Sequence, residues 1–388
     1  MIFHSEELDE KEASVLAEVD RLRNELGYLH RTPQRWYGLL RRNTFAKAIQ
    51  GSNSIEGYAI TTDDAVAAVQ GEEPSIDPKT ETWQAILGYQ EAMTYVLQKV
   101  EDRYFTFSTE ILKSLHYMMV KHDLAKNPGR WRPGSIYVRR EPTGEIVYEG
   151  PDSQQIPSLI DELIESLNVK DSQEHVIVRA AIAHLNLVMI HPFSDGNGRM
   201  GRCLQSLVLA KDGVAGPLFS SIEEYLGRNT QDYYSILGEV GAGSWHPERN
   251  TRPWLRFCLT AHYRQAMTLL RRTRMMQKTW DEVEERVKRL LLPERCIAAV
   301  ADAALGYRVT NPTYRRSADV TEVVARNDLR ELSQRGLLDP KGEKRGRFYI
   351  ASAGVKEIAV RVTENKKIPD PFAEDSISDL TQAKLFPT

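Results

Sequence analysis

The segment Val176–Ile190 constrains the fold of this chain more than any other stretch. It is apolar nearly all round, and it is too long for a strand. A helix that is apolar on every side has to be buried on every side, so we expect it at the centre of a helical domain. Arg179, His184 and Asn186 lie within it, which argues against a membrane span. We interpret His184 as a core histidine with satisfied hydrogen bonds.

Most of the remaining periodicity is also helical. Apolar spacing predicts helices over residues 7–26, 36–50, 61–70, 80–103, 108–122, 156–168, 174–190, 199–211, 229–240 and 251–272. Gly51 is expected to interrupt the second helix, with Ser52–Glu56 as a capped start or a short helical turn. Residues 135–139 and 145–148 predict two short strands, joined by a turn at residues 142–144. The predicted fold class is therefore mainly α, with one β-hairpin.

The composition changes after about residue 275. Residues 276–292 are highly charged and predict a connector helix. Helical segments at 294–304 and 319–335 are followed by a strand, a basic turn at 341–346 and a second strand, an order that resembles a winged helix. The mildly positive charge of this part leaves DNA contact open, although we favour protein contacts. The predicted regions are an N-terminal helical region (1–104), a core (105–272), the connector (273–292), a small α+β winged-helix-like domain (293–362) and a tail (363–388).

The polar loop after the central apolar segment carries the candidate chemistry. It reads His191-Pro192-Phe193-Ser194-Asp195-Gly196-Asn197-Gly198-Arg199-Met200-Gly201-Arg202. Glycines at a helix start let backbone N–H groups point at one anion, and the helix dipole favours phosphate there. Arg199 and Arg202 lie on one face of the following helix, where both guanidinium groups can reach phosphate oxygens. Asp195 can hold Mg²⁺ beside phosphate, and the His191 imidazole can accept a proton from a hydroxyl group.

Other readings of the loop and of the composition are weaker. Residues 196–201 fit the dinucleotide motif G-x-G-x-x-G with Glu223 further on, but that motif needs a preceding strand where this chain has a helical segment. The chain contains no P-loop or protein-kinase motif. Its three cysteines are far apart, which favours reduced thiols and a cytoplasmic protein over a disulfide framework or a zinc site. The net charge of −3 gives no hint of nucleic-acid binding, and no membrane association is expected.

The loop resembles the Fic-domain motif H-x-F-x-[DE]-G-N-G-R-x-x-R at every specified position. The resemblance implies a helical Fic fold and an enzyme that moves AMP from ATP onto a Ser, Thr or Tyr hydroxyl of a target protein, with release of pyrophosphate. It also implies Mg²⁺ as a cofactor, with Asp195 as its ligand, and His191 as the general base. The ATP phosphates are assigned to Gly196, Asn197, Gly198, Arg199 and Arg202.

Two further segments resemble parts of the same family. Residues 129–138 resemble the flap, a hairpin whose edge pairs with the target, which assigns target binding to Ile136, Tyr137 and Val138. Residues 52–57 resemble the inhibitory motif [ST]-x-x-x-E-[GN]. This match assigns inhibition to Ser52, Glu56 and Gly57.

The inhibitory motif implies that the Glu56 carboxylate pairs with Arg202 and displaces the γ-phosphate of ATP. Residues 229–237 resemble the helix of the adenine pocket, which makes Tyr233 and Tyr234 candidate adenosine contacts. The turn at 241–243 is Gly-Ala-Gly where some relatives have a polar residue, so no adenosine contact is assigned there.

Three functional hypotheses follow. The first is a protein adenylyltransferase that is inhibited by Glu56 and also modifies itself. The second keeps the fold but removes AMP from protein, or transfers another nucleotide-linked group. The third is a winged-helix DNA-binding regulator that uses the Fic domain as a nucleotide sensor. The expected partner is a target protein, and a homodimer is compatible with the sequence.

Overall fold

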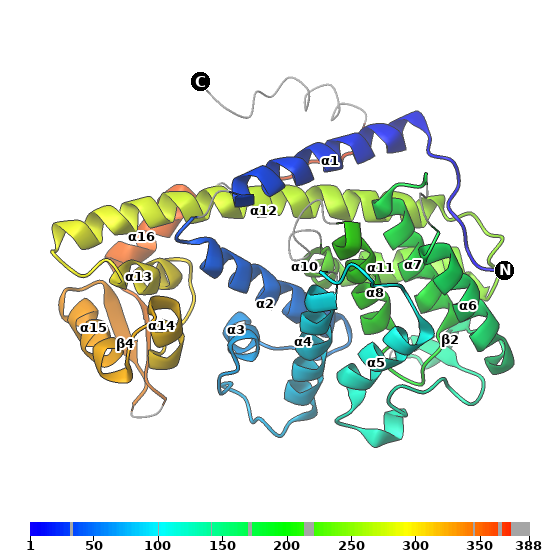
Figure 1. Ribbon diagram of the computed structural model, residues 1–388, viewed down its shortest axis with the longest axis horizontal. Helices are drawn as coiled ribbons and strands as arrows, with labels where there is room; N and C mark the ends of the chain where they lie inside the picture. Colours follow the sequence, from blue (N-terminus) through cyan, green and yellow to red (C-terminus); the bar gives the residue numbers. More distant parts are fainter. Residues whose placement is uncertain are drawn as a thin grey trace.

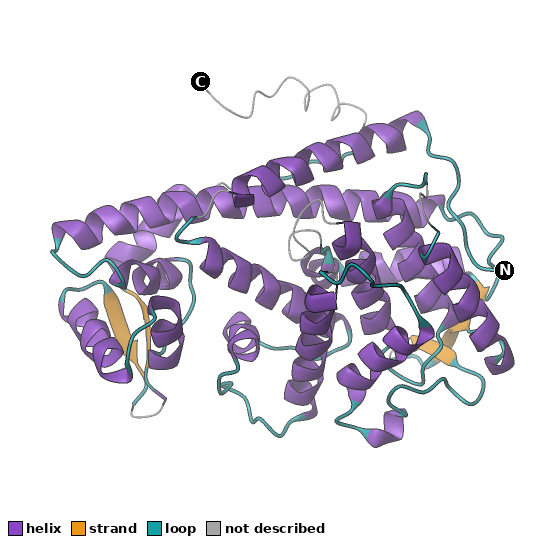
Figure 2. Ribbon diagram, viewed as in Figure 1, coloured by secondary structure: helices purple, strands orange, loops and turns teal. Residues whose placement is uncertain are grey.

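The computed structural model describes residues 1–31, 34–99, 101–140, 142–169, 173–212, 221–343, 346–363 and 367–373. Helices dominate the described chain, which confirms the predicted mainly-α class (Figure 2). The helices before residue 250 are α1 (Glu10–Arg31), α2 (Tyr37–Ile55), α3 (Thr62–Gln70), α4 (Glu81–Lys99), α5 (Thr109–Val120), α6 (Ile156–Leu167), α7 (Val176–Ile190), α8 (Asn197–Asp212), α10 (Glu223–Arg228) and α11 (Thr230–Gly241). Two 3-10 turns, η1 (Leu124–Lys126) and η2 (Ser153–Gln155), lie between them.

Helix α7 lies at the centre of the core, as its apolar sequence predicts. It packs against α6, α8 and the long helix α12 (Arg252–Arg289). His184 is completely buried, which confirms its interpretation as a core histidine. Its Nδ1 lies 2.5 Å from Gln205 Oε1 and its Nε2 lies 3.0 Å from Tyr233 Oη. Burial lowers the pKa of His184 to about 3, so the ring is neutral at physiological pH.

Helix α2 continues through Gly51, so the predicted interruption there is wrong. The glycine has a packing role instead, because a Cβ atom on Gly51 would collide with the carbonyl oxygen of Glu223, and one on Gly227 would collide with Gly51. Ser52–Ile55 is therefore the last turn of α2, and neither a new helix nor an N-terminal cap begins there. The two glycines let α2 and α10 approach closely. Helix α10 itself was not predicted from the sequence.

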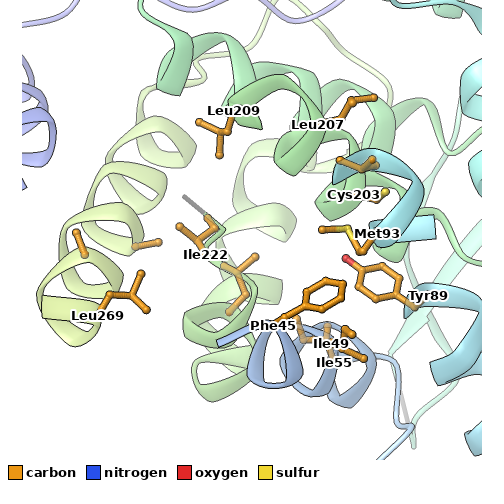
Figure 3. Close-up of a cluster of buried hydrophobic side chains, with 14 of the residues drawn as sticks. Phe45, Ile49, Ile55, Tyr89, Met93, Cys203, Leu207, Leu209, Ile222 and Leu269 are labelled. Atoms are coloured by element: carbon orange, nitrogen blue, oxygen red, sulfur yellow. The ribbon is translucent and has the colours of Figure 1, made fainter. Parts of the chain in front are cut away.

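The apolar face of α2 fixes the end of this helix against the core. Figure 3 shows Phe45 and Ile49 of α2 facing Tyr89 and Met93 of α4, with Cys203 of α8 on the same side. All five side chains are buried. The last turn of α2, which contains Ser52 and directly precedes Glu56, is thus supported by the same cluster that supports α8.

The predicted hairpin is present and belongs to a three-stranded sheet. Strands β1 (Tyr137–Arg140) and β2 (Glu145–Glu149) are antiparallel, with an irregularity in register between Val138 and Arg139. A short strand β3 (Gly243–Ser244), which the sequence did not predict, pairs parallel with β2. The strand order is β1-β2-β3, so β1 lies at an edge of the sheet.

Helix α12 is one continuous helix of 38 residues. The predicted division into a core helix (251–272) and a connector helix (276–292) is therefore wrong. Residues 273–275 contain neither glycine nor proline, so nothing in the sequence stops the helix between the two segments. Figure 1 shows α12 running along the whole core to the C-terminal part of the chain.

The described residues of the C-terminal part form four helices and a two-stranded antiparallel sheet. Its elements are α13 (Cys296–Ala304), α14 (Asn311–Ala318), α15 (Glu322–Gln334), β4 (Leu338–Lys341), β5 (Phe348–Ala351) and α16 (Ala353–Val362). The predicted order of helix, strand, turn and strand is present, and Val309 also pairs with Tyr349 of β5. Helices α14 and α16 were not predicted, and residues 344–345 of the basic turn lie outside the described residues.

Two expectations about the chain as a whole can be compared with the structure. All three cysteines are buried, and they form no disulfide among the described residues. Among the described residues, none of the helices has both the length and the apolar character that a bilayer span requires.

Candidate active site

The loop between α7 and α8 brings the predicted phosphate-binding residues to the start of α8. His191 ends α7 in the left-handed conformation (φ 51°, ψ 57°), and Gly196 also has a positive φ of 77°. Asn197 closes the loop, since its side chain accepts from the Phe193 N–H (2.9 Å) and donates to the Phe193 carbonyl (2.8 Å). The first backbone N–H groups of α8, which have no partner inside a helix, therefore lie at one end of this loop.

The side chain of His191 is oriented by a backbone carbonyl. Its Nδ1 lies 3.1 Å from the carbonyl oxygen of Val188. A carbonyl oxygen only accepts, so Nδ1 carries the proton and Nε2 keeps its lone pair. Burial lowers the pKa of His191 to about 4, and the nearby charge of Arg132 acts in the same direction. The ring is therefore neutral near pH 7, the form that a general base needs.

Asp195 lies between two cations. Its Oδ2 is 3.2 Å from the Lys126 ammonium and 3.6 Å from Nη2 of Arg199. Burial alone would raise the pKa of Asp195, but the positive charges of Arg199 and Lys126 outweigh it and keep that pKa below its usual value. Asp195 is therefore ionised at neutral pH. Lys126 also donates to Glu81 Oε1 (2.6 Å), which fixes the ammonium at this place.

Arg199 and Arg202 are buried cations at the start of α8, each only 1% exposed. Within the described chain, Nε and Nη1 of Arg199 and Nη1 of Arg202 have no hydrogen-bond partner. Unpaired buried donors cost free energy, and the cost is larger when they are charged. An anion with several oxygen atoms would satisfy them, as the polyphosphate of a nucleotide does.

Glu56 reaches from the end of α2 to Arg202. Its Oε1 accepts a hydrogen bond from Arg202 Nη2 at 2.7 Å, and its side chain is 23% exposed. Ser52 accepts from the same guanidinium, through Oγ to Nε (2.8 Å) and through its carbonyl to Nη2 (3.0 Å). A Cβ atom on Gly198 would collide with Glu56 Oε1, so the carboxylate lies against the backbone of the loop. The predicted residues Ser52 and Glu56 are therefore in direct contact with Arg202.

Gly57 lets the chain turn after Glu56, at a positive φ of 83°. The next residue, Tyr58, covers the other arginine, with Arg199 Cζ 5.2 Å from the centre of its ring. The Tyr58 hydroxyl lies 3.0 Å from Glu81 Oε1 and 3.3 Å from the Lys126 ammonium. The segment that follows α2 thus contacts both arginines of the loop.

Sequence reasoning missed His116, whose ring stacks on Phe193 with the centroids 3.7 Å apart. His116 Nδ1 accepts from the Gly129 N–H at 2.9 Å, which leaves Nε2 to donate to the Asp195 carbonyl at 3.0 Å. Burial lowers the pKa of His116 to about 4, so the neutral ring holds both bonds. No local signal marks this residue, because its partners are 13 and 79 positions away in the sequence.

Sequence reasoning also gave no role to Arg132, which connects the loop to the sheet. Its Nε donates to the His191 carbonyl at 2.8 Å, and its backbone N–H donates to the Pro192 carbonyl at 2.9 Å. Nη2 donates to the Pro151 carbonyl beyond β2 at 2.5 Å. Arg132 therefore fixes the base of the hairpin against the residue predicted to be the general base.

The predicted flap residues lie at the edge of the sheet. Ile136 precedes β1 and accepts from the Gly150 N–H at 3.2 Å. Tyr137 and Val138 begin β1, and the Tyr137 side chain is exposed. An edge strand with exposed side chains can accept an added strand through its main chain.

The two tyrosines predicted as adenosine contacts have different positions. Tyr233 is 1% exposed and its ring lies under Arg202, with Cζ 5.9 Å from the ring centre. Because its hydroxyl is bound to the core histidine of α7, its position is that of a packing residue. Tyr234 is half exposed, and its hydroxyl donates to the Ile55 carbonyl at 3.0 Å. Only Tyr234 is therefore open to a ligand, and it also contacts the end of α2.

Comparisons with known proteins identify the fold. The fold is similar to that of a Fic family protein from Desulfovibrio desulfuricans G20, with a TM-score of 0.56 and 20% identity, over 90% of this chain and 99% of that one. The helical core around the loop thus places the protein in the class of Fic-fold proteins. Residues 106–209 match the Fic/DOC family. This stretch of the chain, which contains the loop, therefore resembles a Fic domain.

Curated relatives share parts of their sequence with this chain. It is 25% identical over 224 residues to "Protein adenylyltransferase Fic" of Nematostella vectensis, covering 56% of this chain and 46% of that protein. It is 30% identical over 191 residues to the protein of the same name from Aedes aegypti, covering 49% and 33%. The chain therefore spans less than half the length of these relatives.

Proposed function

We propose that this chain is an ATP-dependent protein adenylyltransferase whose activity is kept low by Glu56. The observation that carries the proposal is the contact between Glu56 and Arg202, beside an Arg199 guanidinium with unpaired buried donors. The site has the donors that a polyphosphate needs, but one of its two arginines is already paired with a carboxylate. Relatives named protein adenylyltransferases support transfer of AMP as the reaction.

The chemistry follows from the charges and tautomers of the loop. The N–H groups at the start of α8, together with Arg199 and Arg202, would bind the phosphates of ATP. His191 Nε2 would take the proton of a target hydroxyl while its oxygen bonds to the α-phosphorus. The bond from the α-phosphorus to the bridging oxygen then breaks, and pyrophosphate leaves with the electron pair. Positioning and charge stabilisation would supply most of the rate, as in other phosphoryl transfers.

Asp195 fits the role of a Mg²⁺ ligand. It is ionised, half-buried and next to the proposed phosphate site. Among the described residues no group of three or more His, Cys, Asp or Glu side chains could hold a metal ion, so the phosphate oxygens would have to supply further ligands. A bound Mg²⁺ would neutralise charge that develops on the phosphates. The Lys126 ammonium, now 3.2 Å from Asp195, would have to give way to it.

Inhibition would act through the position of the γ-phosphate. The Glu56 carboxylate lies beside Gly198 and on Arg202, where it repels a phosphate and occupies one of its ligands. ATP could still bind, but its α-phosphate would be out of line with the attacking hydroxyl, and small displacements cost large factors in rate. The edge of β1 beside this loop would hold the target segment through main-chain hydrogen bonds.

The test compares wild type with Glu56→Gly, Glu56→Gln and the double variant Glu56→Gly/His191→Ala. Each is incubated with Mg²⁺ and α-labelled ATP, alone and with a cell extract, and label on protein is measured. We expect Glu56→Gly to label on the order of a hundredfold faster than wild type, Glu56→Gln to be intermediate, and the double variant to be silent. Glu248→Gly, which removes an exposed glutamate in a loop, is the matched control and should behave as wild type.

Three outcomes contradict the proposal in different ways. Equal labelling by wild type and Glu56→Gly would remove the inhibitory role of Glu56. Labelling that survives in the double variant would remove His191 as the base. A Glu56→Gly variant that stays silent but no longer strips AMP from labelled protein would identify a de-adenylylating enzyme, the second hypothesis on the same fold.

A further inference from the structure

A second site lies away from the loop, where α2 and α12 meet the C-terminal part of the chain. An open cavity of about 430 Å³ is lined there by α2, the start of α3, α12 and the turn after α13. This volume falls within the range of small-molecule sites, roughly 300–1,000 Å³. Nothing in the proposed transfer reaction uses it.

Asn43 of α2 belongs to the lining of this cavity and has an unpaired buried donor. Its side chain is 1% exposed and lines the cavity. Its Oδ1 accepts from Nε (3.0 Å) and Nη2 (2.8 Å) of Arg42. Because only the oxygen of an amide side chain can accept these hydrogen bonds, they fix which end of the amide faces Arg42. Nδ2 has no partner within the described chain. Such a group calls for an acceptor in the cavity.

Lys47, one turn further along α2, adds positive charge to the lining, and the carboxylate that attracts it, Glu224, is already bonded to Arg272. It is half-buried in the lining, and within the described residues it has neither a hydrogen bond nor an ion pair. Burial lowers the pKa of Lys47, and the positive charge of Arg272 lowers it further. Arg272 itself is neutralised by Glu224, through bonds of 2.7 and 3.0 Å. A negative charge in the cavity would therefore be attracted mainly by Lys47.

The one acidic side chain of the lining does not supply that charge. Asp63 accepts from the backbone N–H of Arg308 and pairs with its Nε, both at 3.0 Å. The rest of the lining is largely apolar and includes Met275, Met276 and Tyr307. Methionine side chains adapt to irregular ligand shapes, and an aromatic ring offers a stacking face.

We propose that this cavity binds a small organic anion, a carboxylate or phosphate attached to an apolar or aromatic group. The acidic group lies against the Lys47 ammonium and the Asn43 amide, and the apolar group lies against the two methionines and Tyr307. The ligand bridges the core and the C-terminal part, and thus stabilises the arrangement of both.

Calorimetric titration of the full chain with two probes, benzoate and phenyl phosphate, tests the proposal. Saturable millimolar or tighter binding of at least one probe is expected, together with a rise in Tm. The probe that binds more tightly identifies the acidic group. Lys47→Met and Asn43→Asp should each weaken binding by about tenfold or more. Asn43→Asp keeps the acceptor for Arg42, so the fold is preserved while an anion is repelled.

The controls separate this cavity from the phosphate site. Lys356→Met, at an exposed position of α16, should leave binding unchanged. Absence of saturable binding to wild type in the millimolar range would overturn the proposal. Binding that survives both Lys47→Met and Asn43→Asp but is lost in Arg199→Ala would also overturn it, because the anion would then lie in the loop before α8.

Discussion

Glu223 is a buried carboxylic acid beside the packed glycines of α2 and α10, and it makes stability depend on pH. Its side chain is 1% exposed, and Oε1 accepts from Ser206 Oγ at 2.9 Å. Oε2 has no partner among the described residues. Burial raises the pKa of Glu223 to about 7, although the hydrogen bond from Ser206 and the charge of Arg202 oppose the rise. In the unfolded chain the pKa is about 4.5.

The sign and size of the effect follow from these two values. Between about pH 4.5 and pH 7 the folded protein binds more protons at this site than the unfolded chain does. The contribution of Glu223 to the free energy of unfolding therefore falls as the pH rises through this window, and it is constant above it. The difference between the two pKa values corresponds to about 3 kcal/mol. Glu223→Gln cannot ionise, so it should gain about that much stability relative to wild type between about pH 4 and pH 8.

Urea denaturation at several pH values, followed by circular dichroism, measures this difference. Buried histidines such as His184 and His262 also make the wild-type curve pH-dependent, since burial lowers the pKa of each to about 3. They contribute equally to both proteins and cancel in the comparison. Glu165→Gln, which changes an exposed glutamate of α6, is the control. The difference between its free energy of unfolding and that of wild type should not change with pH. A difference between Glu223→Gln and wild type that is flat from about pH 4 to pH 8 would refute the reasoning.

Three further predictions concern the site. Ser52→Ala leaves the Nε of Arg202 unpaired, so labelling from α-labelled ATP should exceed that of wild type but stay below that of Glu56→Gly. A labelling rate equal to that of wild type would show that Ser52 does not stabilise the ion pair between Glu56 and Arg202. His116→Phe keeps the ring stack but loses both bonds, and thermal denaturation should show a loss of about 2–4 kcal/mol, with Asp195 displaced and transfer slowed. The kcat/KM of Glu56→Gly should be flat between about pH 6 and pH 8, whereas an ordinary histidine base would give about a fourfold rise.

The sequence predicted the helical class and the loop because both depend on local patterns. The apolar run of α7 has one reasonable place in a helical fold, and the spacing of Arg199 and Arg202 puts both on one face of α8. The pairing of Glu56 with Arg202, by contrast, came from a family resemblance, and the contact of Ser52 with Arg202 was not predicted. Periodicity alone gives no information on contacts between residues about 150 positions apart.

The errors have physical causes in tertiary structure. Gly51 reads as a helix break, but its missing side chain is what lets α10 pack against α2. The end of the core helix was predicted from a change in composition, although no residue there stops a helix. His116 and Arg132 were missed because each acts through backbone groups of distant segments, which leave no mark on composition or periodicity.

Because α12 is one continuous helix, it holds the C-terminal part at a fixed distance from the far end of the core. At 1.5 Å per residue, its 38 residues extend about 57 Å. The C-terminal sheet lies at one end of this helix and the sheet next to the candidate active site lies toward the other (Figure 1). A partner bound at the C-terminal part would be held by a rigid rod and not by a flexible tether. Its position relative to the loop of the same chain would therefore be set by the helix.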